Sequence, residues 1–125
     1  MRIFEADERW HGKINFVDEA DVYVGFSWGS LCCESFGYYF VSDPTHKRDE
    51  ALSLTSEELT PLFFDVEFFK ERPGYDRGGE AVFRLFNPHE TADPIYLVLY
   101  NHHNGYYSHG FSMEVGGENV RRGSL

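Results

Sequence analysis

Apolar side chains recur at every second position in several short runs of this chain. One such run places four residues on a single face: Val22, Val24, Phe26 and Trp28. A period of two is typical of a half-buried β-strand, because successive side chains of a strand point to opposite faces. The preceding residues also alternate, so we predict a hairpin over residues 13–28 with a polar connection at 18–21.

A second pair of runs lies in residues 96–115, which read YLVLYNHHNGYYSHGFSMEV. These runs flank a short polar loop that closes on Asn104-Gly105. Asn and Gly adopt positive φ angles at little steric cost, so this dipeptide is the strongest short-range hairpin signal. We therefore predict an antiparallel ribbon that turns back at residues 102–105 and organises the rest of the fold.

The same alternation predicts further strands, which turn signals separate. They cover residues 2–4, 35–42, 62–69 and 81–86. In the third of these runs, one face is predicted to carry Leu62, Phe64, Val66 and Phe68. The polar stretch 43–53 is typical of a long loop, and Thr55-Ser56-Glu57-Glu58 fits a capping box at the start of one helical turn.

The number and spacing of these elements indicate the fold class. About seven short strands without alternating helices favour an antiparallel arrangement over a parallel sheet. We predict an all-β fold, a single sandwich or barrel-like domain with at most one short helix, over residues 1–115. Residues 116–125 carry few apolar anchors, so a flexible C-terminal tail is expected there.

Composition adds an acidic surface and many aromatic side chains. The net charge is −10, and 18% of the residues are aromatic. A field of that sign repels phosphate backbones, so nucleic acid is not an expected partner. No run approaches the roughly 18 apolar residues of a membrane helix, and the first ten residues carry acids where a secretory signal would be apolar. We therefore expect a cytoplasmic protein with no membrane partner.

The densest polar cluster lies in and beside the loop of the predicted ribbon. It contains Asn101, His102, His103, Asn104, Tyr107 and His109. Imidazole titrates near neutrality and binds transition metals, so a general base or a metal site is available, with His103 and His109 as candidate ligands. Turn chemistry already explains the Asn and Gly residues, however. We interpret the cluster first as loop and strand residues that bond to the backbone, and we predict no cofactor.

The two cysteines, Cys32 and Cys33, are adjacent. A disulfide between neighbours needs a strained ring, so we expect reduced thiols. In a strand, one of the two side chains would point inward and pack as a small hydrophobe. The alternative is a nucleophilic thiol paired with a histidine of residues 102–109, which requires the two segments to be neighbours.

Tyrosine and tryptophan are more numerous than one thin core can hide. The residues concerned are Trp10, Trp28, Tyr38, Tyr39, Tyr100, Tyr106 and Tyr107. Such rings combine apolar area with a polar group, which suits an interface or a stacking platform for sugars. The alternative is that each ring buries its body and exposes only its hydroxyl or its indole nitrogen.

Two motifs carry a resemblance to a known family. The Cys32-Cys33 dipeptide in GSLCCESFGYYF and the stretch Asn101–Gly110 resemble a family of small β-domain proteins from bacteria and their phages. The second motif of that family reads N-x-H-N-G-Y-Y-x-H-G, and the family is a domain of unknown function. The resemblance leaves residues 43–79 uncovered and supplies no activity. It implies that the two segments belong to one fold and lie near each other.

Three functions are compatible with these observations. The first is a non-catalytic binding or interaction module that self-associates through an aromatic surface or binds another protein. The second is a small metal-assisted or Cys-His enzyme built from Cys32 or Cys33 and the histidines of residues 102–109. The third is an inhibitor whose acidic surface imitates DNA, which would require acids aligned along one ridge. We favour the first, and an enzyme is the less expected class.

Overall fold

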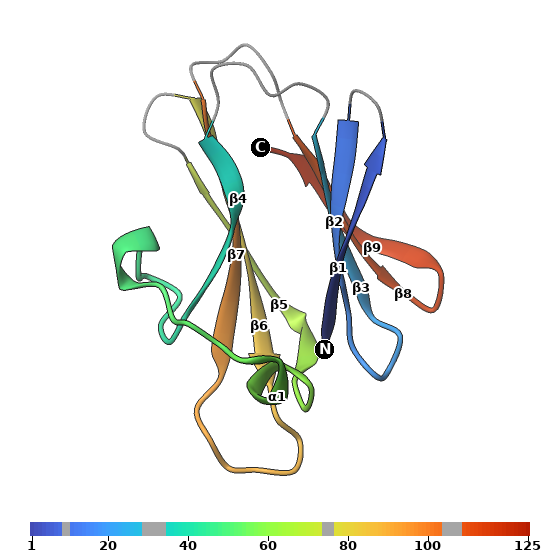
Figure 1. Cartoon of the computed structure of the whole chain (residues 1–125), viewed down its shortest axis with the longest axis vertical. Helices are drawn as coiled ribbons and strands as arrows, with labels where there is room; N and C mark the ends of the chain where they lie inside the picture. Colours follow the sequence, from blue (N-terminus) through green and yellow to red (C-terminus); the bar gives the residue numbers. More distant parts are fainter. Residues whose placement is uncertain (9–10, 29–34, 74–76, 104–108) are drawn as a thin grey trace.

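The computed structural model describes residues 1–8, 11–28, 35–73, 77–103 and 109–125. In these residues the chain forms two antiparallel sheets that face each other across a shared core (Figure 1). The first sheet has the order β1-β2-β3-β8-β9, with bounds Arg2–Glu8, His11–Val17, Tyr23–Trp28, Gly110–Val115 and Glu118–Ser124. The second has the order β4-β7-β6-β5, with bounds Ser35–Val41, Ile95–His103, Arg77–Phe86 and Phe63–Pro73. The predicted all-β antiparallel sandwich is confirmed, and the two sheets do not close into a barrel.

The predicted hairpin over residues 13–28 is confirmed as strands β2 and β3, in which Val17 pairs with Tyr23. Asp18 shapes the connection, because its Oδ1 atom accepts hydrogen bonds from the backbone N–H groups of Ala20 and Val22, both at 2.9 Å. Its Oδ2 atom accepts a third hydrogen bond, also 2.9 Å long, from the backbone N–H of Phe64. This buried carboxylate therefore joins the β2–β3 turn of one sheet to the start of β5 in the other.

The predicted ribbon over residues 96–115 is wrong. Strand β7 pairs with β4 and β6, whereas β8 pairs with β3 and β9, so the two segments belong to different sheets. The Asn104-Gly105 dipeptide itself lies outside the described residues.

The composition of β7 gives the physical reason why this strand pairs with β4 and β6. Leu97 and Leu99 are buried in the core between the sheets, while Val98 is buried on the outer face. A strand that is apolar on both faces belongs in the middle of a covered sheet, with a partner on each side.

Strand β5 contains a bulge that the alternating pattern does not reveal. Asp65 pairs with Arg84, but the next residue pair in the register is Phe69 with Phe83. The extra residues between them reverse the direction of the side chains that follow. Phe69 consequently packs in the core, with its ring 5.4 Å from that of Phe83, and Phe68 packs outside, 5.4 Å from the ring of Tyr96. The predicted single face from Leu62 to Phe68 is therefore wrong beyond Phe64.

The outer face of the four-stranded sheet carries a second apolar layer. Its six buried members are Tyr39, Val41, Val82, Tyr96, Val98 and Tyr100. Residues 42–54 form the predicted loop, which includes the short 3-10 turn η1 (Arg48–Glu50) and a bridge between Leu52 and Phe40. The Arg48 guanidinium lies 5.0 Å from the centroid of the Tyr100 ring. Tyr39 and Tyr100 are thus covered.

The predicted helical turn is confirmed as α1 (Ser56–Leu59). Thr55 Oγ1 accepts a hydrogen bond from the Glu58 backbone N–H at 3.2 Å, and Glu58 Oε1 accepts one from the Thr55 backbone N–H at 3.1 Å. This reciprocal pair is the capping box that the sequence indicates.

The flexible tail expected at residues 116–125 is instead an ordered edge strand. Residues Glu118–Ser124 form β9, which pairs with β8, and Leu125 is buried. The backbone N–H and carbonyl of Leu125 form hydrogen bonds with the carbonyl and N–H of His109, each 2.8 Å long. Backbone pairing replaces the apolar anchors that the segment lacks, so side-chain composition alone gives no sign of this strand.

Candidate functional site

The structure separates the polar cluster that the sequence places around residues 101–109. Asn101, His102 and His109 are described together with their side chains, and for His103 only the backbone in β7 is described. The other four candidate residues lie outside the described part of the chain: Cys32, Cys33, Asn104 and Tyr107.

Asn101 and His109 lie on the inner side, at one end of the sandwich. Both are fully buried. Asn101 Nδ2 donates a hydrogen bond to the Leu125 carbonyl at 3.0 Å. The His109 ring lies 4.6 Å from the ring of Phe36 and 6.0 Å from that of Phe26. These two polar residues therefore hold the end of the chain against the core.

His102 points to the opposite face, because neighbouring residues of a strand alternate in direction. Its Nε2 atom lies 3.7 Å from Glu80 Oε1, and its ring lies 5.0 Å from that of Tyr100. The sheet thus separates His102 from Asn101 and His109, and the three side chains do not converge on one site.

Glu80 is the centre of a hydrogen-bonded group beside His102. Its Oε2 atom accepts hydrogen bonds from the Tyr39 hydroxyl at 2.6 Å and from Arg72 Nη2 at 2.7 Å. Arg72 Nη1 also donates to the backbone carbonyls of Pro44 and His46, at 2.6 and 3.2 Å. Burial and the hydrogen bond to Glu80 raise the pKa of Tyr39, so its hydroxyl ionises only at a higher pH than that of an ordinary tyrosine. The group is suited to holding the loop of residues 42–54 on the sheet rather than to removing a proton.

The strands that lead to the cysteines and to the histidines are neighbours. Ser35, the first residue of β4, pairs with His102 near the end of β7. Within the described residues, no three His, Cys, Asp or Glu side chains form a group that could hold a metal ion.

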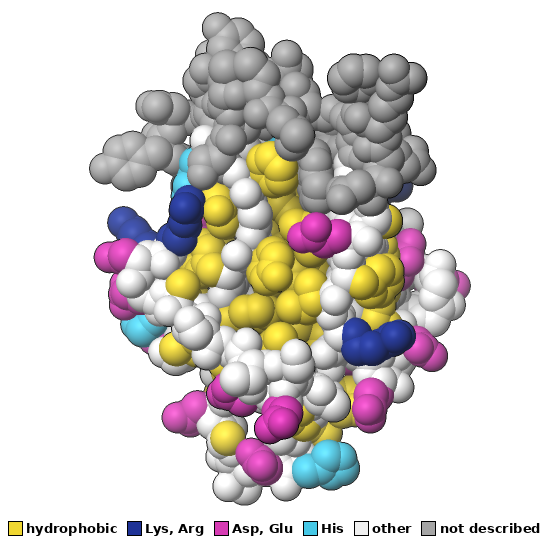
Figure 2. Space-filling model, viewed as in Figure 1, with side chains coloured by type: hydrophobic (Ala, Val, Ile, Leu, Met, Phe, Trp, Pro, Cys, Tyr) yellow, Lys and Arg dark blue, Asp and Glu magenta, His cyan; other side chains and the backbone are white. Residues whose placement is uncertain are grey.

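The edge strands β1 and β4 face each other along one side of the sandwich. We call this side the β1–β4 seam and define it by Ile3 of β1 with Phe36 and Tyr38 of β4. All three are only partly buried although they pack against the core. Figure 2 shows hydrophobic side chains gathered between the two sheets on this face, with charged side chains around them. The acidic side chains visible there are spread around the rim and form no single ridge.

Tyr38 lies across the seam from the first sheet. Its ring packs edge-on against that of Phe16, with centroids 5.1 Å apart. Burial, followed by the nearby charge of Glu5, raises the pKa of the Tyr38 hydroxyl. A pocket of about 610 Å³ lies beside the seam, between residues 1–4 and the turn of Ser56, Leu59 and Thr60.

The opposite side of the sandwich is closed by Arg121 of β9. Its Nη2 atom donates a hydrogen bond to the Val66 carbonyl of β5 at 3.4 Å, and its guanidinium lies 5.3 Å from the centroid of the Phe69 ring. Among the described residues, no hydrogen bond joins β1 to β4 in a similar way. Hydrogen bonds of the described residues thus leave β1 and β4 unbridged, although the Met1 ammonium ties the start of β1 to the carbonyls of Leu59 and Thr60, both at 2.8 Å.

Comparison with protein-family models, with curated proteins and with solved structures gave no match. The resemblance to the bacterial and phage family therefore stays a prediction. Within the described residues, no helix has the length and apolar character to cross a bilayer.

Sequence reasoning anticipated one seam residue, Tyr38, as an interface aromatic and missed Ile3 and Phe36. The alternating pattern shows that these residues face inward. It does not show that both strands lie at sheet edges, where an inward side chain is only partly covered. The strand predicted at residues 2–4 is the start of β1, and the charged residues along Arg2–Glu8 are a signal that this strand lies at a sheet edge.

Proposed function

We propose that the protein is a non-catalytic interaction module that self-associates through the β1–β4 seam. The observation that carries the proposal is the half-buried apolar strip between two edge strands, which, among the described residues, no hydrogen bond spans as that of Arg121 spans the opposite side. A contiguous apolar patch with a polar rim is typical of a protein contact surface.

A second copy of the chain is the occupant that we propose. Packing seam against seam would bury Ile3, Phe36 and Tyr38 of both copies. Glu5 and Ile3 lie two residues apart on β1 and so point to the same face, which places an acid of each copy at the rim of the contact. The net charge of −10 opposes association at long range, and salt screens that repulsion. Association is therefore expected to strengthen as the salt concentration rises.

Sedimentation velocity over a wide range of protein concentrations tests this proposal. We expect the wild-type protein to form dimers, more completely in high salt than in low salt. The Ile3→Glu variant should remain a monomer because it places a charge in the seam. The Phe4→Glu variant is the matched control, because Phe4 is the next residue of β1 and its side chain is exposed. Thermal melting followed by circular dichroism confirms that both variants are folded.

A wild-type protein that stays monomeric at the highest concentration in both salts would refute self-association. Equal loss of the dimer in both variants would show that the contact is not the seam. Hydrogen exchange provides a second measurement, since dimerisation should protect β1 and β4 but not β5.

A second candidate function rests on the pairing of Ser35 with His102. This pairing brings the segment after Cys33 next to the end of β7, as a Cys-His enzyme would require. Such an enzyme predicts one thiol that reacts unusually fast at neutral pH, or bound metal in stoichiometric amount. Ordinary reactivity of both thiols together with a metal-free protein by elemental analysis would exclude it.

A further inference from the structure

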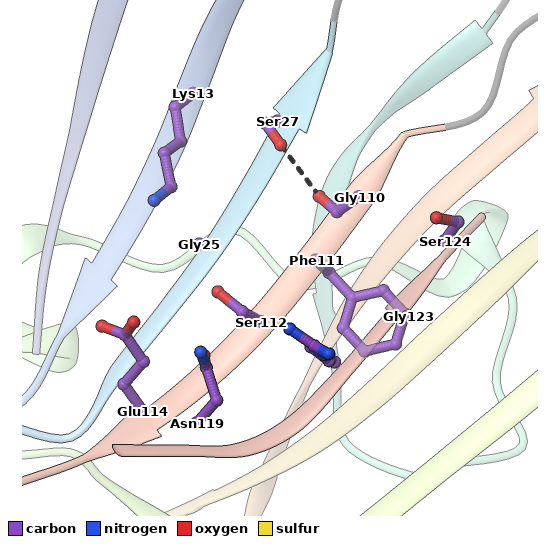
Figure 3. Close-up of a pocket in the computed structure, with 11 residues that line it drawn as sticks. Lys13, Gly25, Ser27, Gly110, Phe111, Ser112, Glu114, Asn119, Gly123 and Ser124 are labelled. Atoms are coloured by element: carbon purple, nitrogen blue, oxygen red, sulfur yellow. Dashed lines mark hydrogen bonds between the residues drawn. The ribbon is translucent and has the colours of Figure 1, made fainter. Parts of the chain in front are cut away.

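The outer face of the five-stranded sheet carries a polar groove. The register of β2, β3, β8 and β9 places outward side chains in rows across these four strands. In one row Gly25 pairs with Ser112, which pairs with Arg122, and in the next Tyr23 pairs with Glu114, which pairs with Asn119. Lys13 and Ser27 pair in a third row, and Ser27 Oγ donates a hydrogen bond to the Gly110 carbonyl at 3.2 Å. Figure 3 shows Lys13, Ser27, Ser112, Glu114 and Asn119 of these rows as sticks around the groove, with the hydrogen bond from Ser27 to Gly110 dashed.

Small residues in the centre of the rows make the hollow. Gly25 and Gly110 have no side chain, and Ser112 has a short one, so the groove reaches about 490 Å³. A Cβ atom on Gly25 would lie 2.5 Å from Lys13 Cε and 2.8 Å from the Tyr23 hydroxyl, which means that the Lys13 side chain lies across this glycine. The Lys13 ammonium lies 4.9 Å from the centroid of the Tyr23 ring. Long polar side chains, Lys13 among them, therefore lie beside and over the small residues of the groove.

The charges of the groove differ from those of the whole protein. Lys13 and Arg122 line it together with a single acid, Glu114, so its side chains carry a net charge of +1 in a chain of net charge −10. No carboxylate of the described residues forms an ion pair with Lys13 or Arg122, whereas Arg72 and Arg84 are paired with Glu80 and Asp65. Two cations that form no ion pair with a carboxylate of the described residues are suited to an anion from outside the protein.

The remaining lining groups indicate what the anion carries. Ser27, Ser112, Ser124 and Asn119 provide hydroxyl and amide groups that both donate and accept hydrogen bonds. Glu114 accepts hydrogen bonds and repels a second negative charge.

We propose that the outer groove binds a sugar-sized, hydroxyl-rich molecule with one carboxylate, such as a hexuronic acid. The carboxylate contacts Lys13 and Arg122, and the ring hydroxyls contact the serines, Asn119 and Glu114. The groove and the β1–β4 seam lie on different faces of the sheet, so this inference does not depend on self-association.

Titration of the ¹⁵N-labelled protein with sodium D-glucuronate, followed by amide chemical shifts, tests the inference. We expect saturable shifts at residues 25, 112 and 122. Glucose lacks the charge, acetate lacks the hydroxyl groups, and glucose 6-phosphate is a dianion, so each should bind more weakly. The Arg122→Gln variant should bind glucuronate about tenfold more weakly, as expected for the loss of one hydrogen bond to a charged group. Lys70→Gln is the matched control, because it removes one exposed cation from the other sheet.

Each other result overturns part or all of the inference. Acetate binding as tightly as glucuronate would reduce the groove to an unspecific anion site. Tighter binding of glucose 6-phosphate would replace the sugar acid with a sugar phosphate, and equal binding of glucose would remove the role of the two cations. An Arg122→Gln protein with well-dispersed amide signals and unchanged affinity would exclude the groove as the site, as would the absence of any glucuronate shift in the wild type.

Discussion

Replacement of Asp18 with alanine should strongly destabilise the fold, because this one side chain joins a turn of one sheet to a strand of the other. The carboxylate accepts three backbone hydrogen bonds, from Ala20, Val22 and Phe64. The donors of the last two bonds are buried, whereas the N–H of Ala20 can turn to water. A hydrogen bond to a charged group contributes about 1.5–3 kcal/mol, and a buried donor left without a partner loses a similar amount. Two such losses, partly relieved by relaxation, give an expected decrease of about 3 kcal/mol in the free energy of unfolding.

Urea denaturation followed by far-UV circular dichroism measures this loss. The decrease should be large beside the total stability of a small domain, which is about 5–15 kcal/mol. Glu19→Ala is the matched control, because Glu19 is the next residue in the same turn and is exposed. The decrease in the free energy of unfolding for Asp18→Asn should lie between those of Asp18→Ala and Glu19→Ala. The amide keeps one acceptor oxygen, but it presents an NH₂ donor to the N–H groups that the second carboxylate oxygen accepts from. A decrease below about 1 kcal/mol for Asp18→Ala would refute the inter-sheet role, because it is less than one such hydrogen bond contributes.

Three further predictions concern Arg72, Asp65 and Tyr39, which are ionisable groups of the four-stranded sheet. Arg72→Lys should speed amide hydrogen exchange in residues 43–54, because an ammonium cannot reach the several acceptors to which the guanidinium donates hydrogen bonds. Unchanged exchange would show that other contacts hold the loop. Burial alone would raise the pKa of Asp65, but hydrogen bonds from Arg84 and the backbone lower it overall. Arg84→Gln should therefore raise the pKa of Asp65, which carbon-detected NMR measures. The variant should also lack the stability that the wild type loses only as the pH falls through the lowered pKa of Asp65. The raised pKa of Tyr39 means that its contribution to stability is present at neutral pH and decreases above pH ~10, where the unfolded tyrosine ionises. Tyr39→Phe should therefore be less stable at neutral pH but should flatten that alkaline decrease in urea denaturation, and an equally steep decrease would assign it to other groups.

Features that depend on nearby residues could be predicted from the sequence. The β2–β3 hairpin follows from alternation around a polar turn, and the capping box of Thr55 and Glu58 follows from a spacing of three residues. In both cases the interacting groups lie in one short segment. The all-β class follows in the same way, from the sum of such segments.

Features that depend on the choice of a distant partner could not be predicted. Alternation in β7 and β8 is compatible with a hairpin and with two separate sheets, and only the burial of both faces of β7 decides between them. The bulge in β5 could not be recognised from the sequence, because the residues before it and after it are all of types that are common in strands. The outer groove needs the register of four strands, which brings Lys13, Gly25, Ser112 and Arg122 together from distant parts of the chain.

The place of β8 in the first sheet has a consequence for how the molecule forms. Strand β3 has β2 as one neighbour, but its other neighbour is β8, which follows all four strands of the second sheet in the chain. During synthesis the first three strands therefore leave the ribosome long before the strand that completes their sheet. Pairing between residues far apart in the chain is slow, because a long loop must close before any contact forms. We expect slow refolding limited by the docking of β8, and an exposed edge on β3 that invites wrong pairing until β8 arrives.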